Sequence, residues 1–393
     1  MIQFPNRKYY WFLHLFFAIS MLSSNAVLSQ KIEDIHTNWS VAEYLPSLAQ
    51  EKESLGIAGP ITGTNNGVFI VAGGANFPEL MPWQGGKKVY YKDVFVYTRK
   101  DKQISFKKSA KLPYNIAYAA CCSLPQGIFV AGGENETGII NSAYLLRWNN
   151  QNENIGTEIL PALPFALTNA SAVAINNIVY VAGGEAANSV SNKLLALDLH
   201  QLNKGWQLLP NIPKALSHAV MTVLRDGQND RIFLIGGREK KQSGISELYQ
   251  TVFEFNVQKS IWSEKASLPY CLSAATGVSF GFNDILIFGG DDGKTFHQVE
   301  LFLAAINNEK DSLKKQAIVL QKNSLQASHP GFSKNILRFN FPTNTWTIVE
   351  SILIDIPVTT IAVDCDGVVL IPSGEIRAGV RSPKILSVKI LPN

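Results

Sequence analysis

The stretch FIVAGG at positions 69–74 is a short β-branched run that ends in two glycines, and it recurs along the chain. Four further copies share its form: IFVAGG (128–133), VYVAGG (179–184), IFLIGG (232–237) and ILIFGG (285–290). Their first glycines are separated by 59, 51, 53 and 53 residues, and an altered sixth copy, VVLIPSG (368–374), follows later. A near-constant period of this length indicates an array of similar units rather than two or three unrelated domains.

Other pieces of the repeat keep a constant order around the glycine pair. Trp39, Trp206 and Trp262 each stand seven residues before a proline, and Phe106 keeps the same spacing. After the proline come a strand-like run, a turn, the run into Gly-Gly, and a further alternating strand such as YLLRW (144–148). Four strands per repeat with Gly-Gly after the second are typical of a kelch blade. The sequence therefore predicts an all-β, six-bladed kelch-type β-propeller in which the tryptophan packs between adjacent blades.

The order of the pieces also predicts how the ring closes. The chain begins with a fourth strand that carries Trp39, and it ends with KILSVKIL (384–391), a third strand without a fourth. We expect the N-terminal strand to complete the last blade, because closure removes the exposed edges of an open sheet. Residues 301–335 break the period with a mixed, partly helical pattern, so an insertion over one face is expected there. Whether it is a solvated loop or a cover for a site stays open.

The first 29 residues have the features of an export signal. Arg7 and Lys8 precede an apolar run at 9–22, which is shorter than the roughly 20 residues that span a bilayer, and small residues follow. We expect removal of residues 1–29, a propeller over 30–393, and a periplasmic or secreted protein without a membrane span after signal removal. A signal anchor is the alternative.

Composition excludes several classes of protein. A net charge of +4, with 17% charged residues, is too small for phosphate-backbone binding, so no nucleic-acid partner is expected. Adjacent residues of a strand point to opposite faces, as Cys121 and Cys122 would. We expect these two cysteines, Cys271 and Cys365 to be small buried hydrophobes rather than disulfides. No His/Cys spacing suits zinc, and no cofactor or metal is expected.

Ionisable residues follow five of the six glycine pairs. Loops after the second strands of propeller blades converge near the axis, so these positions are the first candidates for a binding site. They are Glu134, Glu185, Arg238, Asp291 and Glu375, while Asn76 lies in the corresponding loop of the first repeat. The alternative for any one of them is a solvent-exposed residue at the end of a loop.

The last of these loops reads SGEIRAGVR (373–381) and places one carboxylate and two guanidiniums close together. It resembles the Asn-Gly-Glu-x-x-x-Gly-x-Arg segment of bacterial sialic-acid mutarotases, also called N-acetylneuraminate epimerases, which are six-bladed kelch propellers. GIAG (56–59), GGANF (73–77) and Ala117-Tyr118 are similar to other pieces of that family, in a rotated order. The chain thus resembles a cyclically permuted group of the family. Ser373 and Ala378 replace an asparagine and a proline of the pattern, and no ionisable group is lost.

The resemblance implies an isomerase that interconverts the α and β anomers of N-acetylneuraminate, a small acidic sugar, by opening and closing its ring. A base must take the proton of the anomeric hydroxyl while an acid protonates the ring oxygen. By resemblance, Glu375 is the base and Arg381 holds the sugar carboxylate through paired hydrogen bonds. The expected pocket residues are Arg377, Asn76, Tyr118, Glu134, Glu185, Arg238 and Asp291. His218 is interpreted as a structural histidine, and the oligomeric state stays open.

Proteins of other classes share this architecture. A non-catalytic kelch propeller that binds a protein or glycan partner would expose a large apolar patch. A copper oxidase would need a Tyr/His ligand set, which six histidines without paired placement do not favour. A glycosidase needs two facing carboxylates, and Glu134, Glu185 or Asp291 could meet Glu375 across the channel. A sialidase would need a tyrosine nucleophile, three arginines and Asp-box repeats, and the sequence has no such boxes.

Overall fold

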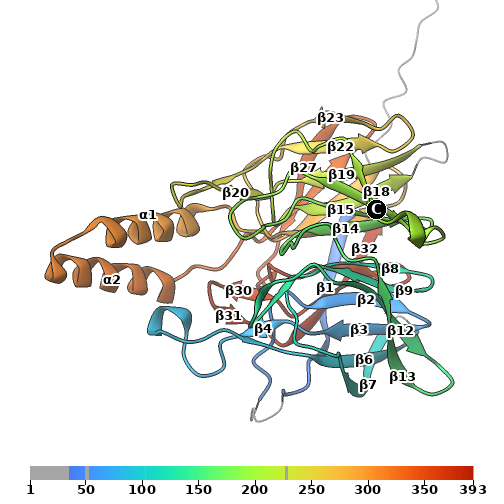
Figure 1. The fold of residues 1–393 in the computed structure, drawn as a ribbon, viewed down its shortest axis with the longest axis horizontal. Helices are drawn as coiled ribbons and strands as arrows, with labels where there is room; N and C mark the ends of the chain where they lie inside the picture. Colours follow the sequence, from blue (N-terminus) through green and yellow to red (C-terminus); the bar gives the residue numbers. More distant parts are fainter. Residues whose placement is uncertain (1–34, 49–52, 102, 226–228, 393) are drawn as a thin grey trace, which may run out of the picture.

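Six four-stranded antiparallel sheets form most of the structure, which is a computed structural model describing residues 35–392 apart from 49–52, 102 and 226–228 (Figure 1). The sheets are arranged as the blades of a β-propeller, as the sequence predicts. The first strands of neighbouring blades contact one another, so these strands are innermost. The expected export signal, residues 1–29, lies outside the described residues.

Each of the first five blades uses four strands in chain order. Blade 1 contains β2 (Ile61–Asn65), β3 (Val68–Ala72), β6 (Asp93–Lys100) and β7 (Gln103–Lys111); blade 2 contains β8 (Ala120–Leu124), β9 (Gly127–Ala131), β12 (Ala143–Asn149) and β13 (Asn154–Leu160); blade 3 contains β14 (Ser171–Ile175), β15 (Ile178–Ala182), β16 (Leu194–Asp198) and β17 (Gln207–Leu209), with the short helix η2 (Leu202–Lys204) before β17. Blade 4 contains β18 (Val220–Arg225), β19 (Asp230–Ile235), β22 (Val252–Asn256) and β23 (Ile261–Lys265); blade 5 contains β24 (Thr276–Phe280), β25 (Asp284–Phe288), β26 (Asn335–Asn340) and β27 (Thr345–Ser351).

The sixth blade joins the two ends of the chain. Its strand order is β28 (Val363–Asp364), β29 (Val368–Pro372), β32 (Lys384–Pro392) and β1 (Ile35–Tyr44). Strand β1 pairs antiparallel with β32 from Ile35 opposite Pro392 to Tyr44 opposite Lys384. The Trp39 ring on β1 meets Phe288 of blade 5 edge-on, with ring centroids 5.6 Å apart. The predicted closure by the N-terminal strand is confirmed.

Glycine pairs end the second strand of the first five blades, where a side chain would collide with the backbone or side chains of neighbouring segments. Gly73 adopts φ 65°, and a Cβ on it would lie 2.4 Å from the Ile116 carbonyl oxygen. In blade 6 the equivalent residue is Ser373, which takes the same left-handed conformation at φ 54°. Its buried hydroxyl accepts a hydrogen bond from the Ile57 N–H at 2.8 Å and donates one to the Ser382 carbonyl at 2.7 Å. These hydrogen bonds offset the strain of a non-glycine residue in this region.

The tryptophans of the outer strands connect adjacent blades. The indole N–H of Trp206 donates to the carbonyl of Pro161, and that of Trp262 donates to the carbonyl of Pro210, at 2.8 and 2.9 Å. The Trp206 ring also lies against Phe129 of blade 2, with centroids 6.1 Å apart. The prediction that tryptophan packs between blades is confirmed.

The four cysteines all lie in the described residues, and none is in a disulfide. Cys121 and Cys365 are buried, whereas Cys122 and Cys271 are partly exposed, so the expectation that all four are buried was wrong for two of them. For Cys122 the reason is strand alternation, which turns its side chain to the face opposite Cys121.

The connections between second and third strands project from one face. They form short hairpins: β4 (Ala75–Asn76) with β5 (Val89–Tyr90), β10 (Glu134–Asn135) with β11 (Gly138–Ile139), β20 (Arg238–Lys240) with β21 (Ser246–Leu248), and β30 (Glu375–Arg377) with β31 (Val380–Arg381). In blade 3 a single bridge, Glu185 with Val190, takes the place of a hairpin. The first hairpin also carries the short helix η1 (Pro82–Gln84).

In blade 5 this connection is a pair of helices, α1 (Lys294–Asn308) and α2 (Ser312–Ala327), which overlap the expected insertion but begin earlier. They project side by side from the face that carries β4, β20, β30 and β31 (Figure 1). The buried carboxylate of Glu300 on α1 accepts hydrogen bonds from the Ser246 N–H at 2.8 Å and hydroxyl at 2.7 Å, which fixes α1 to blade 4. Within the described residues, neither helix combines the length and hydropathy that crossing a bilayer requires.

Candidate active site

A closed ring of backbone hydrogen bonds surrounds the propeller axis. One residue from the start of each blade donates its N–H to the carbonyl of the equivalent residue in the preceding blade, at 2.7–3.2 Å. All six residues have φ between 53° and 63°; they are Gly59, Tyr118, Asn169, His218, Ala274 and Thr359. Left-handed backbone is unfavourable for non-glycine residues and is concentrated at functional sites. The ring therefore fixes these side chains around the axis.

The ring also explains why the residues after the glycine pairs converge. The residue before each ring position pairs with the residue after the glycine pair of its own blade: Ala58 with Ala75, Ala117 with Glu134, Thr168 with Glu185, Ser217 with Arg238, Ser273 with Asp291, and Val358 with Glu375. The pairing is the same in every blade, so it brings five ionisable side chains to equivalent places around the axis.

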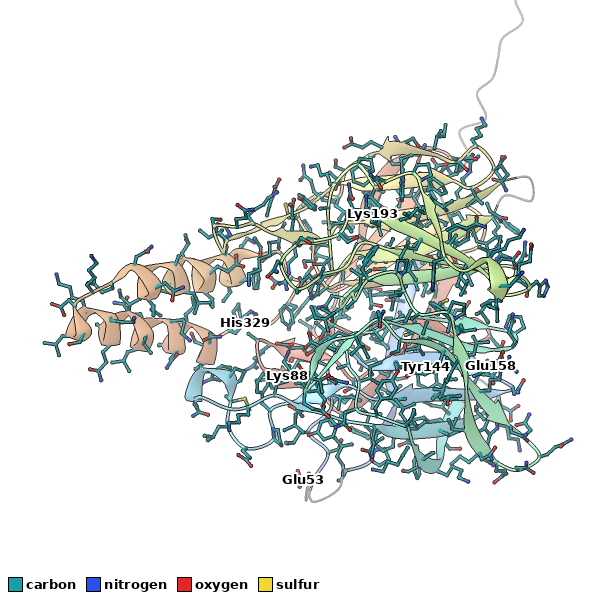
Figure 2. All side chains as sticks on the ribbon, viewed as in Figure 1. Glu53, Lys88, Tyr144, Glu158, Lys193 and His329 are labelled. Atoms are coloured by element: carbon teal, nitrogen blue, oxygen red, sulfur yellow. The ribbon has the colours of Figure 1, made fainter. Side chains whose placement is uncertain are left out.

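These side chains line one cavity of about 430 Å³, a size typical of small-molecule sites. Residues from all six blades contribute to it, together with the helical segment of blade 5. The polar and charged residues at its wall are Lys88, Tyr118, Glu134, Asn169, Glu185, His218, Arg238, Ser273, Asp291, Thr295, Gln326, His329, Thr359, Glu375 and Arg381. Figure 2 shows Lys88 and His329 on the side of the propeller that faces the helices.

Glu375 and Arg381 lie side by side in this cavity. They are paired residues of the β30–β31 hairpin, and Arg381 Nη2 is 3.5 Å from Glu375 Oε2. The other carboxylate oxygen of Glu375 accepts a hydrogen bond from the Gly379 N–H. Gly379 packs against Pro82 and Trp83 of η1, so this short helix of blade 1 contacts the turn of the β30–β31 hairpin.

Two nitrogens of the Arg381 guanidinium have no hydrogen-bond partner within the described residues. They are Nε and Nη1, and the side chain is 3% exposed. The Phe77 ring lies under the guanidinium at 4.9 Å, which holds its plane without using any N–H. A buried cation with unpaired donors is costly unless a ligand completes its hydrogen bonds, and an arginine of this kind fits a carboxylate.

The opposite wall carries a cluster of Glu185, Ser217, His218 and Arg238. The Ser217 hydroxyl donates to Glu185 Oε1 at 2.8 Å and lies 3.0 Å from His218 Nδ1, while Arg238 Nη2 is 3.5 Å from the same Glu185 oxygen. Since the hydroxyl proton is directed to Glu185, Nδ1 of His218 is the donor to Ser217, and Nε2 is left as an acceptor. Burial, with the positive charges of Arg238 and Lys88, holds the pKa of His218 well below its usual value.

A third group of side chains surrounds Glu134. The Lys88 ammonium is 3.0 Å from Glu134 Oε1 and lies over the Tyr118 ring at 5.0 Å, and the Tyr90 hydroxyl donates to the same carboxylate oxygen at 2.8 Å. Burial and this hydrogen bond raise the pKa of Tyr90 to about 12. Glu134 is thus satisfied by protein donors, so it is a weaker candidate for proton transfer than Glu375.

Blade 5 supplies two further titratable groups. Asp291, equivalent to Glu375 in the neighbouring blade, accepts the Gly293 N–H at 2.8 Å; burial and the charges of Asp292 and Glu375 raise the pKa of its carboxyl. His329, from the segment after α2, accepts the Gly331 N–H at Nδ1, which leaves Nε2–H as the donor of the neutral ring. Burial lowers the pKa of His329.

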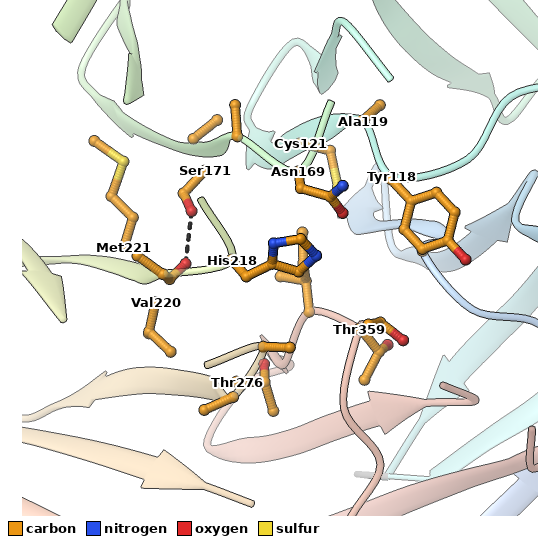
Figure 3. A pocket seen from close by; sticks show the side chains of 18 of the residues that line it. Tyr118, Ala119, Cys121, Asn169, Ser171, His218, Val220, Met221, Thr276 and Thr359 are labelled. Carbon is orange, nitrogen blue, oxygen red and sulfur yellow. Dashed lines mark hydrogen bonds between the residues drawn. The ribbon is translucent and has the colours of Figure 1, made fainter. Parts of the chain in front are cut away.

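The two helices contribute to the cavity wall where they join the propeller. Thr295, Phe296 and Val299 of α1 and Gln326 of α2 line it, and the Arg238 guanidinium stacks on Phe296 at 4.6 Å. The insertion expected at 301–335 is mostly helical, and its residues Gln326, His329 and Phe332 line the cavity, so it is not only a solvated loop. Below the ring a smaller space of about 110 Å³ continues along the axis, with His218, Asn169 and Tyr118 at its border (Figure 3).

Two predicted pocket residues do not line the cavity. Asn76 is 3% exposed, and its amide binds the Gly56 carbonyl and the Phe77 N–H. It is the second residue after its glycine pair, so strand alternation turns it away from the axis. Arg377 is exposed, because the β30–β31 pairing is irregular between Glu375 and Arg377. Tyr118, Glu134, Glu185, Arg238, Asp291, Glu375 and Arg381 all line the cavity.

Sequence reasoning missed part of the wall. Asn169, His329, Ser273 and the α1 residues were not expected there, and His218 was expected only to be structural. A signal for two of them exists: Tyr118, Asn169, His218 and Ala274 each stand five residues after a proline. This constant spacing from the proline identifies the residue that occupies the ring position in blades 2 to 5.

The fold and site define the class: a six-bladed kelch-type β-propeller with a charged cavity on its axis. A sequence model of the N-acetylneuraminate epimerase family matches residues 20–155 and 160–393. The chain belongs to this family. Within the described residues, no group of three or more His, Cys, Asp or Glu side chains is placed to hold a metal ion.

Several curated relatives carry the name N-acetylneuraminate epimerase. The protein of Brucella melitensis is 26% identical over 241 residues, which is 60% of each chain, and that of Pasteurella multocida is 22% identical over 57% of each chain. The protein of Brucella suis is 33% identical over 30% of this chain and 32% of its own length. The matched parts thus span less than two thirds of these relatives.

Proposed function

We propose that this protein is a mutarotase that interconverts the α and β anomers of N-acetylneuraminate by opening and closing the sugar ring. The observation that carries the proposal is the buried Arg381 guanidinium, with two unpaired nitrogens, beside the Glu375 carboxylate in the axial cavity. Family membership and the names of the relatives support the same activity.

The substrate fits this pair by its own chemistry. N-acetylneuraminate carries a carboxylate and a hydroxyl on one carbon, the anomeric carbon. Arg381 binds the carboxylate, and Glu375 lies close enough to take the hydroxyl proton. The Phe77 ring keeps the guanidinium in position before the substrate arrives, which reduces the entropy lost on binding.

An acid must protonate the ring oxygen as the ring bond breaks, and Asp291 is suited to this step. It lines the same cavity from the neighbouring blade, and burial raises the pKa of its carboxyl, so it holds a proton more readily than an exposed aspartate does. In ring opening Glu375 gains the hydroxyl proton and Asp291 gives a proton to the ring oxygen. In ring closure on the other face of the carbonyl carbon, both transfers reverse, so the protein returns to its starting state.

Anomer exchange of freshly dissolved sugar, followed by NMR, tests the proposal. We expect the protein to accelerate exchange of N-acetylneuraminate and not that of N-acetylmannosamine, a neutral sugar without a carboxylate. Exchange of N-acetylneuraminate at the buffer rate would refute the proposed activity. Equal acceleration of both sugars would remove the role of Arg381 as a carboxylate anchor.

The proposal includes export of the protein. Residues 1–29 would direct it to the periplasm or outside the cell. N-terminal sequencing of the protein recovered from the periplasm of a bacterial host tests this. A mature protein that still begins at Met1 would contradict it.

A further inference from the structure

A second cavity, of about 320 Å³, adjoins the axial cavity on the side remote from Glu375. Glu134 and Glu185 line both cavities, so the two spaces meet at these side chains. They belong to blades 2 and 3, and in a closed ring of six blades blade 3 lies opposite blade 6, which carries Glu375 and Arg381. We call this space the side cavity.

The side cavity offers hydrogen-bonding groups rather than free anions. Thr168, which lines it, is a buried residue whose hydroxyl has no hydrogen-bond partner in the described part of the chain. Asn188 and Gln242 line it with exposed amides. Its two carboxylates are compensated, because Glu134 is paired with Lys88 and Glu185 lies beside Arg238. Such a lining suits a hydroxylated group.

The positive charge of Lys240 at the side cavity favours an acidic occupant. Lys241 is held by Glu239 and Glu247, whereas Lys240 is exposed and makes no ion pair within the described residues. An acidic group on the occupant would meet this positive charge, although an exposed pair of this kind contributes little affinity. The hydroxyl and amide contacts would supply most of the binding.

The side cavity is space in addition to the volume that one sugar ring would occupy in the axial cavity. The axial cavity alone has the volume of a small-molecule site. In the proposed binding mode, with the anomeric carbon at Arg381 and Glu375, the far end of the sugar would lie toward blades 2 and 3, across the axis. A substituent on that far end would enter the side cavity.

We propose that the side cavity is a second saccharide subsite, so that the protein also acts on acidic oligosaccharides whose reducing end is the reacting sugar. The inference rests on the proposed function for the placement of that reducing end. A second sugar attached through the hydroxylated side chain of the first leaves the anomeric hydroxyl free, which mutarotation requires.

Binding of two sugars tests the subsite. The probes are N-acetylneuraminate and a disaccharide of two such residues joined through the side chain of the reducing one. Titration calorimetry should show the disaccharide binding at least about tenfold more tightly to the unmodified protein, equivalent to about 1.4 kcal/mol. Ala187→Trp, which fills the side cavity from an exposed position, should abolish this advantage and leave monosaccharide binding within about twofold.

Two further variants keep the result interpretable. Gln151→Trp places the same side chain on an exposed turn outside both cavities and should change neither affinity. Asn188→Ala should weaken only the disaccharide. Equal affinity for both sugars in the unmodified protein, no binding of the disaccharide, or an advantage that survives Ala187→Trp would overturn the subsite. Anomer exchange in the same samples reports separately on the proposed activity, so tight disaccharide binding without exchange would refute only that activity.

Discussion

Arg381 Nη2 lies 3.5 Å from Glu375 Oε2 across a two-stranded hairpin in which the two residues are paired. Strand register, rather than the length of a flexible loop, therefore sets the separation between the proposed carboxylate anchor and the proposed base. A sugar that carries its carboxylate and its hydroxyl on one carbon presents the two groups at a similarly fixed, short separation. For the proposed reaction, the hairpin would be pre-organised around one carbon atom of the sugar.

Glu375→Gln should remove the base and keep the hairpin, because the glutamine carbonyl can still accept the Gly379 N–H. We expect anomer exchange to fall by about 10²–10⁴-fold, the usual contribution of general acid–base catalysis. NMR exchange rates at saturating N-acetylneuraminate measure this. Glu158→Gln, on an exposed outer strand, is the matched control. Unchanged exchange in Glu375→Gln would exclude Glu375 from proton transfer.

Arg381→Lys should weaken substrate binding more than it slows the chemistry. Lysine keeps the charge but loses the planar pair of donors and the stacking on Phe77. We expect KM to rise by about 10-fold or more, corresponding to about 1.4 kcal/mol, with a smaller change in kcat. Saturation curves for anomer exchange separate the two parameters, with exposed Arg147→Lys as the control. An unchanged KM would remove the anchor role.

Asp291→Asn should lower the rate and alter its dependence on pH. The acid is active when protonated, so exchange in the unmodified protein should fall as pH rises through the raised pKa of Asp291. An asparagine does not titrate, so the variant should lose this decline and be slower by about 10²-fold or more at pH values below it. Rate–pH profiles of the two proteins measure this. A variant that keeps the same decline would show that another group causes it.

His218→Asn should make stability less sensitive to mild acid. The pKa of His218 is lowered in the folded protein, so below about pH 6.5 the unfolded chain binds a proton that the folded chain does not. The free energy of unfolding therefore decreases as pH falls, by up to about 1.4 kcal/mol per pH unit for this group. Asparagine also tolerates the φ of 56° at this position.

Urea unfolding at pH 7 and pH 5 measures the effect. The His218→Asn variant should lose less stability between these pH values than the unmodified protein. His200→Asn, at an exposed histidine, should not differ from it. If both variants lose as much stability as the unmodified protein, burial of neutral His218 is not the cause.

Removal of β1 should prevent stable folding. Without residues 35–44, β32 becomes an open edge and the Trp39 contact with Phe288 is lost. A protein that begins at residue 46 should show no cooperative thermal transition by circular dichroism, whereas one that begins at residue 30 should melt normally. Cooperative melting of the shorter protein at the same temperature would contradict closure by β1.

The repeat predicted most of the fold because its signals are local. The glycine pair marks a place where a Cβ collides with the next blade, as at Gly73, and the Trp39 strand without partners indicates how the ring closes. The site was predicted in part for the same reason, since Glu134, Glu185, Arg238, Asp291 and Glu375 occupy one repeated position. Asn76 does not line the cavity because Ala75, one residue earlier, occupies the repeated position. A shift of one residue reverses the direction of a side chain in a strand.

The amino-acid sequence by itself determined the number of blades, the closing strand and the ionisable residues that face the axis. Each of these depends on spacing along the chain, which repetition makes visible. The tertiary structure decided which groups keep hydrogen-bond donors without a partner, as Arg381 does at Nε and Nη1, and which are fully paired, as Glu134 is with Lys88. It also placed His218 and the α1 side chains at the cavity wall. Pairing and burial depend on residues from different blades, and the distances between blades are set only when the ring is complete.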